Sequence, residues 1–68
     1  MEDRDTAIAD ALEALHMGQQ AIRASVEEMA LWLRARGSEG TYQNAMVALQ
    51  ALDINADAIS SAIERLRS

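Results

Sequence analysis

Apolar residues recur along the chain at alternating steps of three and four, in two stretches separated by a short polar segment at 36–41. This spacing keeps one face of an α-helix turned continuously toward a partner helix. Only at 36–41 does the pattern break, so the sequence predicts two helices. The first stripe consists of Ile8, Leu12, Leu15, Gln19, Ile22, Val26, Met29 and Leu33. The second consists of Tyr42, Ala45, Leu49, Leu52, Ala56, Ile59, Ile63 and Leu66.

Residues suited to helix ends lie on both sides of the break. Asp and Thr at positions 3–6 can cap the free amides of a first turn. Gly37 is free to take the left-handed backbone conformation that closes many helices. Ser38 or Thr41 can cap the second helix. We therefore expect the first helix to end and the second to begin within a few residues of Gly37.

A connection of about four residues forces the two helices to lie adjacent and antiparallel. The sequence thus predicts an all-α fold, an antiparallel two-helix hairpin with helices at about 4–36 and 39–67, forming one domain over 1–68. Folding one stripe back onto the other places Val26 opposite Leu52.

Further small and apolar side chains lie outside the two stripes, and an isolated hairpin has no need of them. Rows of exposed apolar residues mark interfaces, and a helix that is apolar around most of its circumference belongs inside a bundle. We therefore expect a homo-oligomer, a dimer that forms a four-helix bundle. The sequence leaves the number and orientation of the protomers open. The expected interface residues are Ala14, Gly18, Ala21, Val47, Ala51, Ile54 and Ala58.

Composition and charge narrow the possible functions. The formal net charge is −5, and the basic residues are six scattered arginines, which disfavours binding to nucleic acid. The chain has no cysteine and one histidine, so we expect no disulfide, no metal and no cofactor. No apolar run approaches the length of a membrane span, and the acidic first residues are unlike a secretory signal. A cytoplasmic protein with no membrane partner is the expectation.

The residues before the break combine cations with an aromatic ring. Trp32, Arg34 and Arg36 could bind an acidic protein surface or a phosphate, because tryptophan and arginine are enriched among binding anchors. Equally, the arginines could complement the helix dipole and Trp32 could cap the core. Leu31 and Met17 complete the expected partner-binding set. We expect no catalytic residues, since no Ser-His-Asp set or Gly-rich phosphate loop is present.

Two polar residues stand out in the first helix. Gln19 occupies a stripe position where an aliphatic residue is usual, and a polar group there can fix the register of pairing. His16 follows Leu15 and is expected on the flank of the stripe as a partly exposed residue.

The segment 48–55 and the helix after it resemble the helix-turn-helix of Fis-type DNA-binding domains. The resemblance covers about twenty residues. Asp53 stands where the turn glycine belongs, and the helix after it carries Asp57 and Glu64 in place of side chains that reach bases. The three-four pattern also continues through 53–55, where that fold requires a turn.

In shape the chain resembles two kinds of small hairpin oligomer. One is the plasmid-encoded Rop regulators, dimeric four-helix bundles that bind paired RNA loops; the basic face for RNA is missing here. The other is a set of phage-encoded hairpins that block host regulators or sequester cyclic nucleotides. Ala51 and the segment 55–59 resemble a short motif of the nucleotide-sequestering hairpins. Only the architecture carries over.

We therefore expect a non-enzymatic, homo-oligomeric hairpin that binds and inhibits another protein, host or cognate. The alternative is an oligomer that sequesters an anionic nucleotide through Arg23 or the pair Arg34 and Arg36. A DNA-binding regulator is the third possibility.

Overall fold

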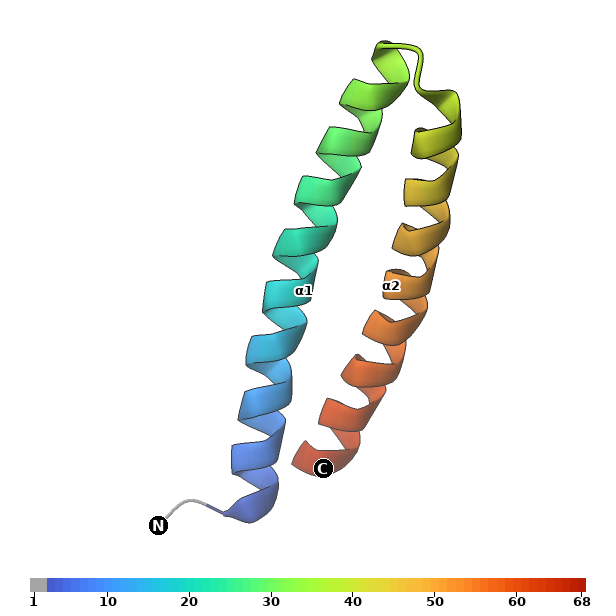
Figure 1. Ribbon diagram of the computed structural model, residues 1–68. Coiled ribbons are helices and arrows are strands. Elements are labelled where there is room, and N and C mark those ends of the chain that lie inside the picture. The colour runs from blue at the N-terminus through green and yellow to red at the C-terminus, as the bar shows by residue number, and fades with distance from the viewer. Residues whose placement is uncertain (1–2) are drawn as a thin grey trace.

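The computed structural model describes residues 3–68 and consists of two long helices, α1 (Arg4–Ala35) and α2 (Glu39–Arg67). The helices lie side by side and antiparallel, joined by a short turn (Figure 1). Their Cα atoms span 54 × 17 × 11 Å. The predicted hairpin is confirmed, with α1 ending one residue earlier than expected. Neither helix contains a segment long and apolar enough to cross a membrane, among the residues described.

The turn after α1 has the hydrogen bonds of a Schellman motif, in which two amides beyond the helix bond back to its last carbonyls. The Gly37 amide donates to the Arg34 carbonyl at 3.0 Å, and the Ser38 amide donates to the Leu33 carbonyl at 2.9 Å. Gly37 has φ 91°, the left-handed conformation predicted for it. Ser38 is the N-cap of α2, as one of the two expected alternatives, although its side chain makes no capping bond.

The stripe predicted on α2 is confirmed at every position as the side that faces α1. All eight of its residues are buried or partly buried. Leu49 is 1% exposed, the one large side chain that is fully buried in residues 3–68. The helix also runs without interruption through 53–55. The turn that a Fis-type helix-turn-helix needs is therefore not formed.

The stripe predicted on α1 is only half correct. Its positions Leu12, Gln19, Val26 and Leu33 are partly buried against α2, but Ile8, Leu15, Ile22 and Met29 are exposed. The places of these four are taken by the residues that follow them, Ala9, His16, Arg23 and Ala30. Both rows have the same seven-residue spacing, so periodicity alone cannot choose between them. Small alanines at the two outer positions and ion pairing by Arg23 favour the observed row.

Little of the hairpin is buried. Ala9, Ala30 and Leu49 are the buried hydrophobic residues of the described chain, which has an accessible surface of 5102 Å². A compact monomer of this mass, 7.4 kDa, would expose about 4,200 Å². The excess follows from the shape, because two helices cannot enclose a core between them.

Candidate interaction surfaces

Ion pairs link the two helices along one broad face of the hairpin. Arg23 on α1 donates from Nε to Asp53 Oδ1 at 2.6 Å and from Nη2 to Asp53 Oδ2 at 3.1 Å. Its Nη1 also donates to Glu27. Hydrogen bonding to Arg23 holds the pKa of the Asp53 carboxyl below its usual value, and the two carboxylates raise the pKa of Arg23. Arg23 is thus engaged by two carboxylates, which counts against its expected role in holding a nucleotide.

A second ionic cluster joins the ends of the helices on the same face. Arg67 Nη2 of α2 donates to Asp10 Oδ1 and to Glu13 Oε2 of α1, both at 2.8 Å. The two hydrogen bonds raise the pKa of Arg67. We call the side of the hairpin that carries both clusters the charged face.

The opposite side of the hairpin carries no charged side chain over most of its length. Helix geometry places on this side the exposed row of α1, from Ile8 to Met29, and the α1 residues three positions after each of its members. It also places there the α2 residues that follow the same three-four spacing through Ala48. We call this surface the uncharged face. On α1 it consists of Ile8, Ala11, Leu15, Gly18, Ile22, Ser25, Met29 and Trp32. On α2 it consists of Thr41, Asn44, Ala48, Ala51, Asn55, Ala58 and Ala62.

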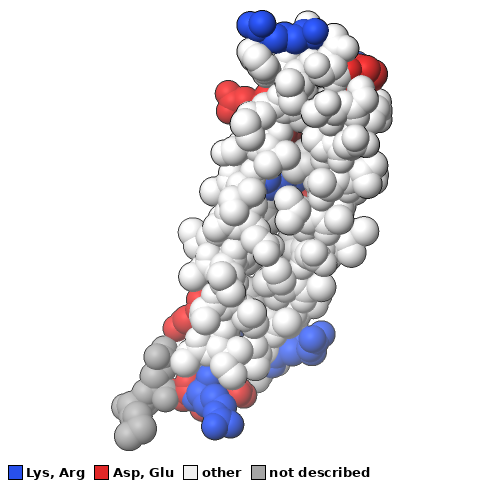
Figure 2. All heavy atoms as spheres, in the orientation of Figure 1, with Lys and Arg blue, Asp and Glu red and all other residues white. Residues whose placement is uncertain are grey.

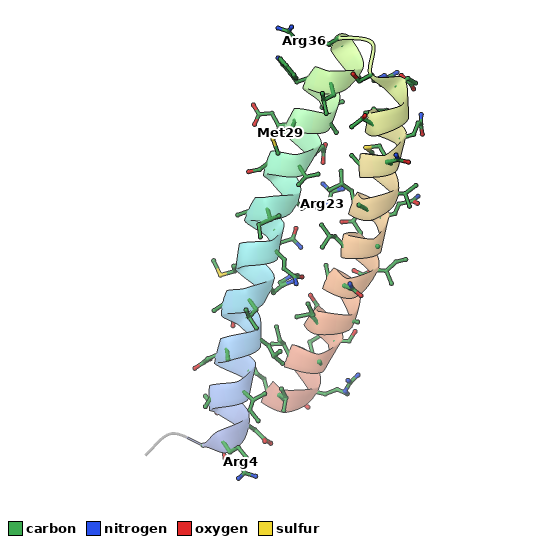
Figure 3. All side chains as sticks on the ribbon, viewed as in Figure 1. Arg4, Arg23, Met29 and Arg36 are labelled. Atoms are coloured by element: carbon green, nitrogen blue, oxygen red, sulfur yellow. The ribbon has the colours of Figure 1, made fainter. Side chains whose placement is uncertain are left out.

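Figure 2 looks onto the uncharged face, where charged atoms gather at the ends and edges and are sparse between them. In the same orientation, Arg36 lies at the turn end, Arg4 at the other end, and Arg23 between the helices (Figure 3). The four large side chains of the exposed row, from Ile8 to Met29, are 44–64% exposed. The row is therefore an apolar stripe with no partner inside the protomer.

At the turn end, two arginines stack on the two aromatic rings of the chain. The guanidinium of Arg36 lies 4.2 Å from the centroid of the Trp32 ring. That of Arg34 lies 4.9 Å from the centroid of the Tyr42 ring, across the hairpin. At exposed sites each cation–π contact contributes about 0.5–1 kcal/mol. The sequence prediction that Trp32 and Arg36 form a joint spot is consistent with this geometry.

The other expected partner-binding residues are more scattered. Leu31 is exposed beside Trp32, on the outer side of α1. Met17 is exposed as well, but it lies fourteen residues from Leu31, about 21 Å along the helix axis. Met17 is therefore not part of the turn-end cluster.

The seven expected interface residues fall on different surfaces. Gly18, Ala51 and Ala58 lie on the uncharged face. Val47 and Ile54, 67% and 70% exposed, lie on the outer edge of α2. Ala14 and Ala21 lie on the outer edge of α1, which points the opposite way. One flat partner cannot cover all seven. Sequence reasoning missed the row from Ile8 to Met29 because it had been assigned to the hairpin's own contact.

In residues 3–68, two buried side-chain polar atoms have no hydrogen-bond partner, and both lie between the helices: His16 Nδ1 and Gln19 Oε1. Gln19 faces α2 as predicted. His16 is partly exposed as expected, but it lies in the contact between the helices and not on its flank. His16 belongs to the row from Ala9 to Ala30, and Gln19 belongs to the half of the predicted stripe that faces α2.

Within residues 3–68, no pocket and no group of three metal-ligating side chains is present. No family model matches the chain, and comparison with curated proteins and with solved structures gives no match either.

Proposed function

We propose that the protein is a non-enzymatic helical hairpin that self-associates into a four-helix bundle and binds another protein, whose activity it inhibits. One observation carries the proposal: the apolar residues of the hairpin are mostly on its surface. Nine large hydrophobic side chains are exposed, whereas Leu49 is the one that is fully buried in the described chain. Contiguous apolar surface of this kind marks sites of protein association.

The turn end supplies the surface for the foreign partner. Trp32 is 55% exposed and lies against the guanidinium of Arg36, a contact that favours one orientation of the ring before binding. Preorganised aromatic and arginine side chains are typical binding anchors. The positive charges of Arg34 and Arg36 favour an acidic surface on the partner. A host or cognate protein with such a surface is the expected target.

The experiment that tests partner binding is affinity capture from the native cell with mass spectrometry, followed by measurement of binding to the purified candidate. The variant Trp32→Ala with Arg36→Ala should lose the partner, whereas Met17→Ala, remote from the turn, should retain it. Unchanged binding by the double variant would show that the turn end is not the site. Thermal-shift measurements with nucleotides form a parallel arm, because a ligand of the folded state raises the melting temperature. A nucleotide-dependent rise would favour the sequestering alternative.

A further inference from the structure

We propose that a second copy of this chain covers the uncharged face, with α1 packed antiparallel on α1 of the mate, so that the two turns lie at opposite ends of the dimer. This inference rests on the self-association proposed above, and it specifies the surface and the orientation. The surface differs from the outer edges that carry Val47 and Ile54.

The pattern of side chains on the uncharged face is a complete three-four stripe of its own. From Ile8 to Trp32 it alternates steps of three and four without a charged residue. By contrast, the row of α1 that faces α2 inside the hairpin includes His16, Gln19 and Arg23. The exposed stripe therefore carries fewer charged and polar groups than the surface that the hairpin uses. Such a stripe is expected to find a partner helix.

From Ile8 to Met29, large and small residues alternate along this stripe, and the alternation is complementary to itself when reversed. An antiparallel pair centred between Gly18 and Ile22 places one large side chain opposite one small side chain in each inner layer. Equal layers keep the two helix axes at a constant separation, which close packing requires. The facing pairs are Ala11 with Met29, Leu15 with Ser25 and Gly18 with Ile22. Beyond these layers, at the rim of the contact, Ile8 of the mate covers one edge of Trp32 and leaves the rest of its ring to the turn-end surface.

Other orientations of the same two faces pack less well. In a parallel pair, Ile22 meets Ile22 of the mate and Gly18 meets Gly18, so wide and narrow layers alternate. In a third arrangement the two turns lie at the same end of the dimer, and α1 of one chain then packs on α2 of the mate. At the register set by the Arg23–Asp53 pair, Ile22 would then face Asn55, an amide. The antiparallel α1 pair avoids both mismatches.

Gly18 has no role within the protomer. A Cβ atom built on it meets nothing within 4 Å, although glycine inside a helix costs about 1 kcal/mol relative to alanine. In the proposed dimer, Gly18 lies where Ile22 of the mate approaches, at the centre of the contact. The missing side chain leaves room there for the isoleucine.

The area of the contact is also consistent with a second copy. At this register Arg36 of one chain comes opposite Arg4 of the other, and both lie at the ends of the molecule (Figure 3), where water screens their repulsion. The stripe spans about 36 Å of helix, and the hairpin is 17 Å wide. The dimer would bury on the order of 1,200 Å² in total, which is at the lower end of the range for stable interfaces.

The surface is tested by sedimentation equilibrium of three proteins over a wide concentration range. The wild type should be a dimer. Ile22→Glu should weaken association by at least about a hundredfold, because an unpaired charge would be buried in the contact. Ile54→Glu, on the outer edge, should leave the dimer intact. If Ile54→Glu dissociates the dimer and Ile22→Glu does not, the assignment of the face is wrong while self-association stands. A wild type that is monomeric throughout would overturn both.

Because Ile22→Glu could unfold a hairpin that depends on its dimer, a second pair of variants keeps the test decisive. Gly18→Leu improves helix propensity and adds a side chain in open space within the protomer. It should nevertheless break the dimer by clashing with Ile22 of the mate. The matched control is Ala21→Leu, on the outer edge of α1, which should leave the dimer unchanged. A Gly18→Leu dimer as tight as the wild type would contradict the proposal.

Orientation is measured separately, and the absence of cysteine makes site-specific labelling simple. A nitroxide on Glu39→Cys, at the start of α2, reports the distance between the turns by electron spin resonance. The proposed dimer predicts a separation close to the 54 Å length of the hairpin. A separation of about 20 Å, two helix diameters, would show that the turns lie together and would refute the antiparallel α1 pair.

Discussion

The two helices have the same three-four apolar pattern, but they use it differently. On α2, every predicted stripe residue faces α1, and Leu49 is fully buried. On α1, half of the predicted stripe points away from α2, and the residues that replace it include His16 and Arg23. The hairpin therefore covers the predicted stripe of α2, although Val47 and Ile54 stay exposed on its outer edge, and leaves half of the predicted stripe of α1 uncovered.

This difference shows which apolar surfaces are covered within one chain and which are left for another chain to cover. A helix with apolar residues around most of its circumference cannot bury all of them against one neighbouring helix. α1 faces α2 with Leu12, Val26 and Leu33 together with alanines and polar residues. The large apolar side chains of the row from Ile8 to Met29 lie instead on a surface that another helix can cover. The two broad faces follow from this choice, one crossed by ion pairs and one without charge.

The largest expected effect comes from truncating the side chain that α2 buries. Leu49→Ala should lower the free energy of unfolding by about 2–3 kcal/mol, through lost burial and a residual cavity. Urea denaturation followed by circular dichroism measures it. Leu49→Met, which keeps the volume, should cost less than about 1.5 kcal/mol.

The matched truncation on α1 should behave differently. Leu15→Ala removes an exposed side chain from the uncharged face, so in dilute protein it should change stability by no more than about 0.5 kcal/mol. At concentrations where the dimer forms, the cost should grow, because the dimer covers Leu15. A cost that is independent of concentration would erase the contrast between the helices.

An effect smaller than that of Leu49→Ala is expected from the polar residues that α1 places against α2. Gln19→Leu should raise the free energy of unfolding by about 1 kcal/mol, because it removes a buried carbonyl oxygen that has no hydrogen-bond partner. Gln20→Leu, an exposed neighbour, is the control and should change little. If Gln19→Leu destabilises the hairpin or yields mixed oligomers, the amide has a role in fixing the register.

The smallest effect concerns the charged face. Because Arg23 lowers the pKa of Asp53 in the folded state, this pair stabilises the fold above the unfolded-state value of about 3.9. The contribution is lost as the pH falls through the lower pKa of the folded state. Asp53→Asn should therefore lose less stability than the wild type on acidification from pH 5 to pH 2. Asp57→Asn is the control for the removal of a negative charge. If Asp53→Asn loses as much stability on acidification as the wild type does, the Arg23–Asp53 pair is not the source of the pH dependence.

Much of the fold could be predicted from local signals. The Gly37 turn, the helix bounds and the stripe on α2 all follow from residue types at fixed spacing. The turn-end pair of Trp32 and Arg36 is four residues apart on one helix, a spacing that brings side chains together. The Arg23–Asp53 pair could not be found this way, because its partners are thirty residues apart.

The sequence by itself determined that two antiparallel helices form and where they turn, because periodicity, glycine and short connections act locally. Only the tertiary structure decided which row of α1 meets α2, since the row from Ile8 to Met29 and the row from Ala9 to Ala30 have identical spacing. The choice depends on how closely the helices approach and on which charges can pair across them. Those properties exist only once both helices are in place.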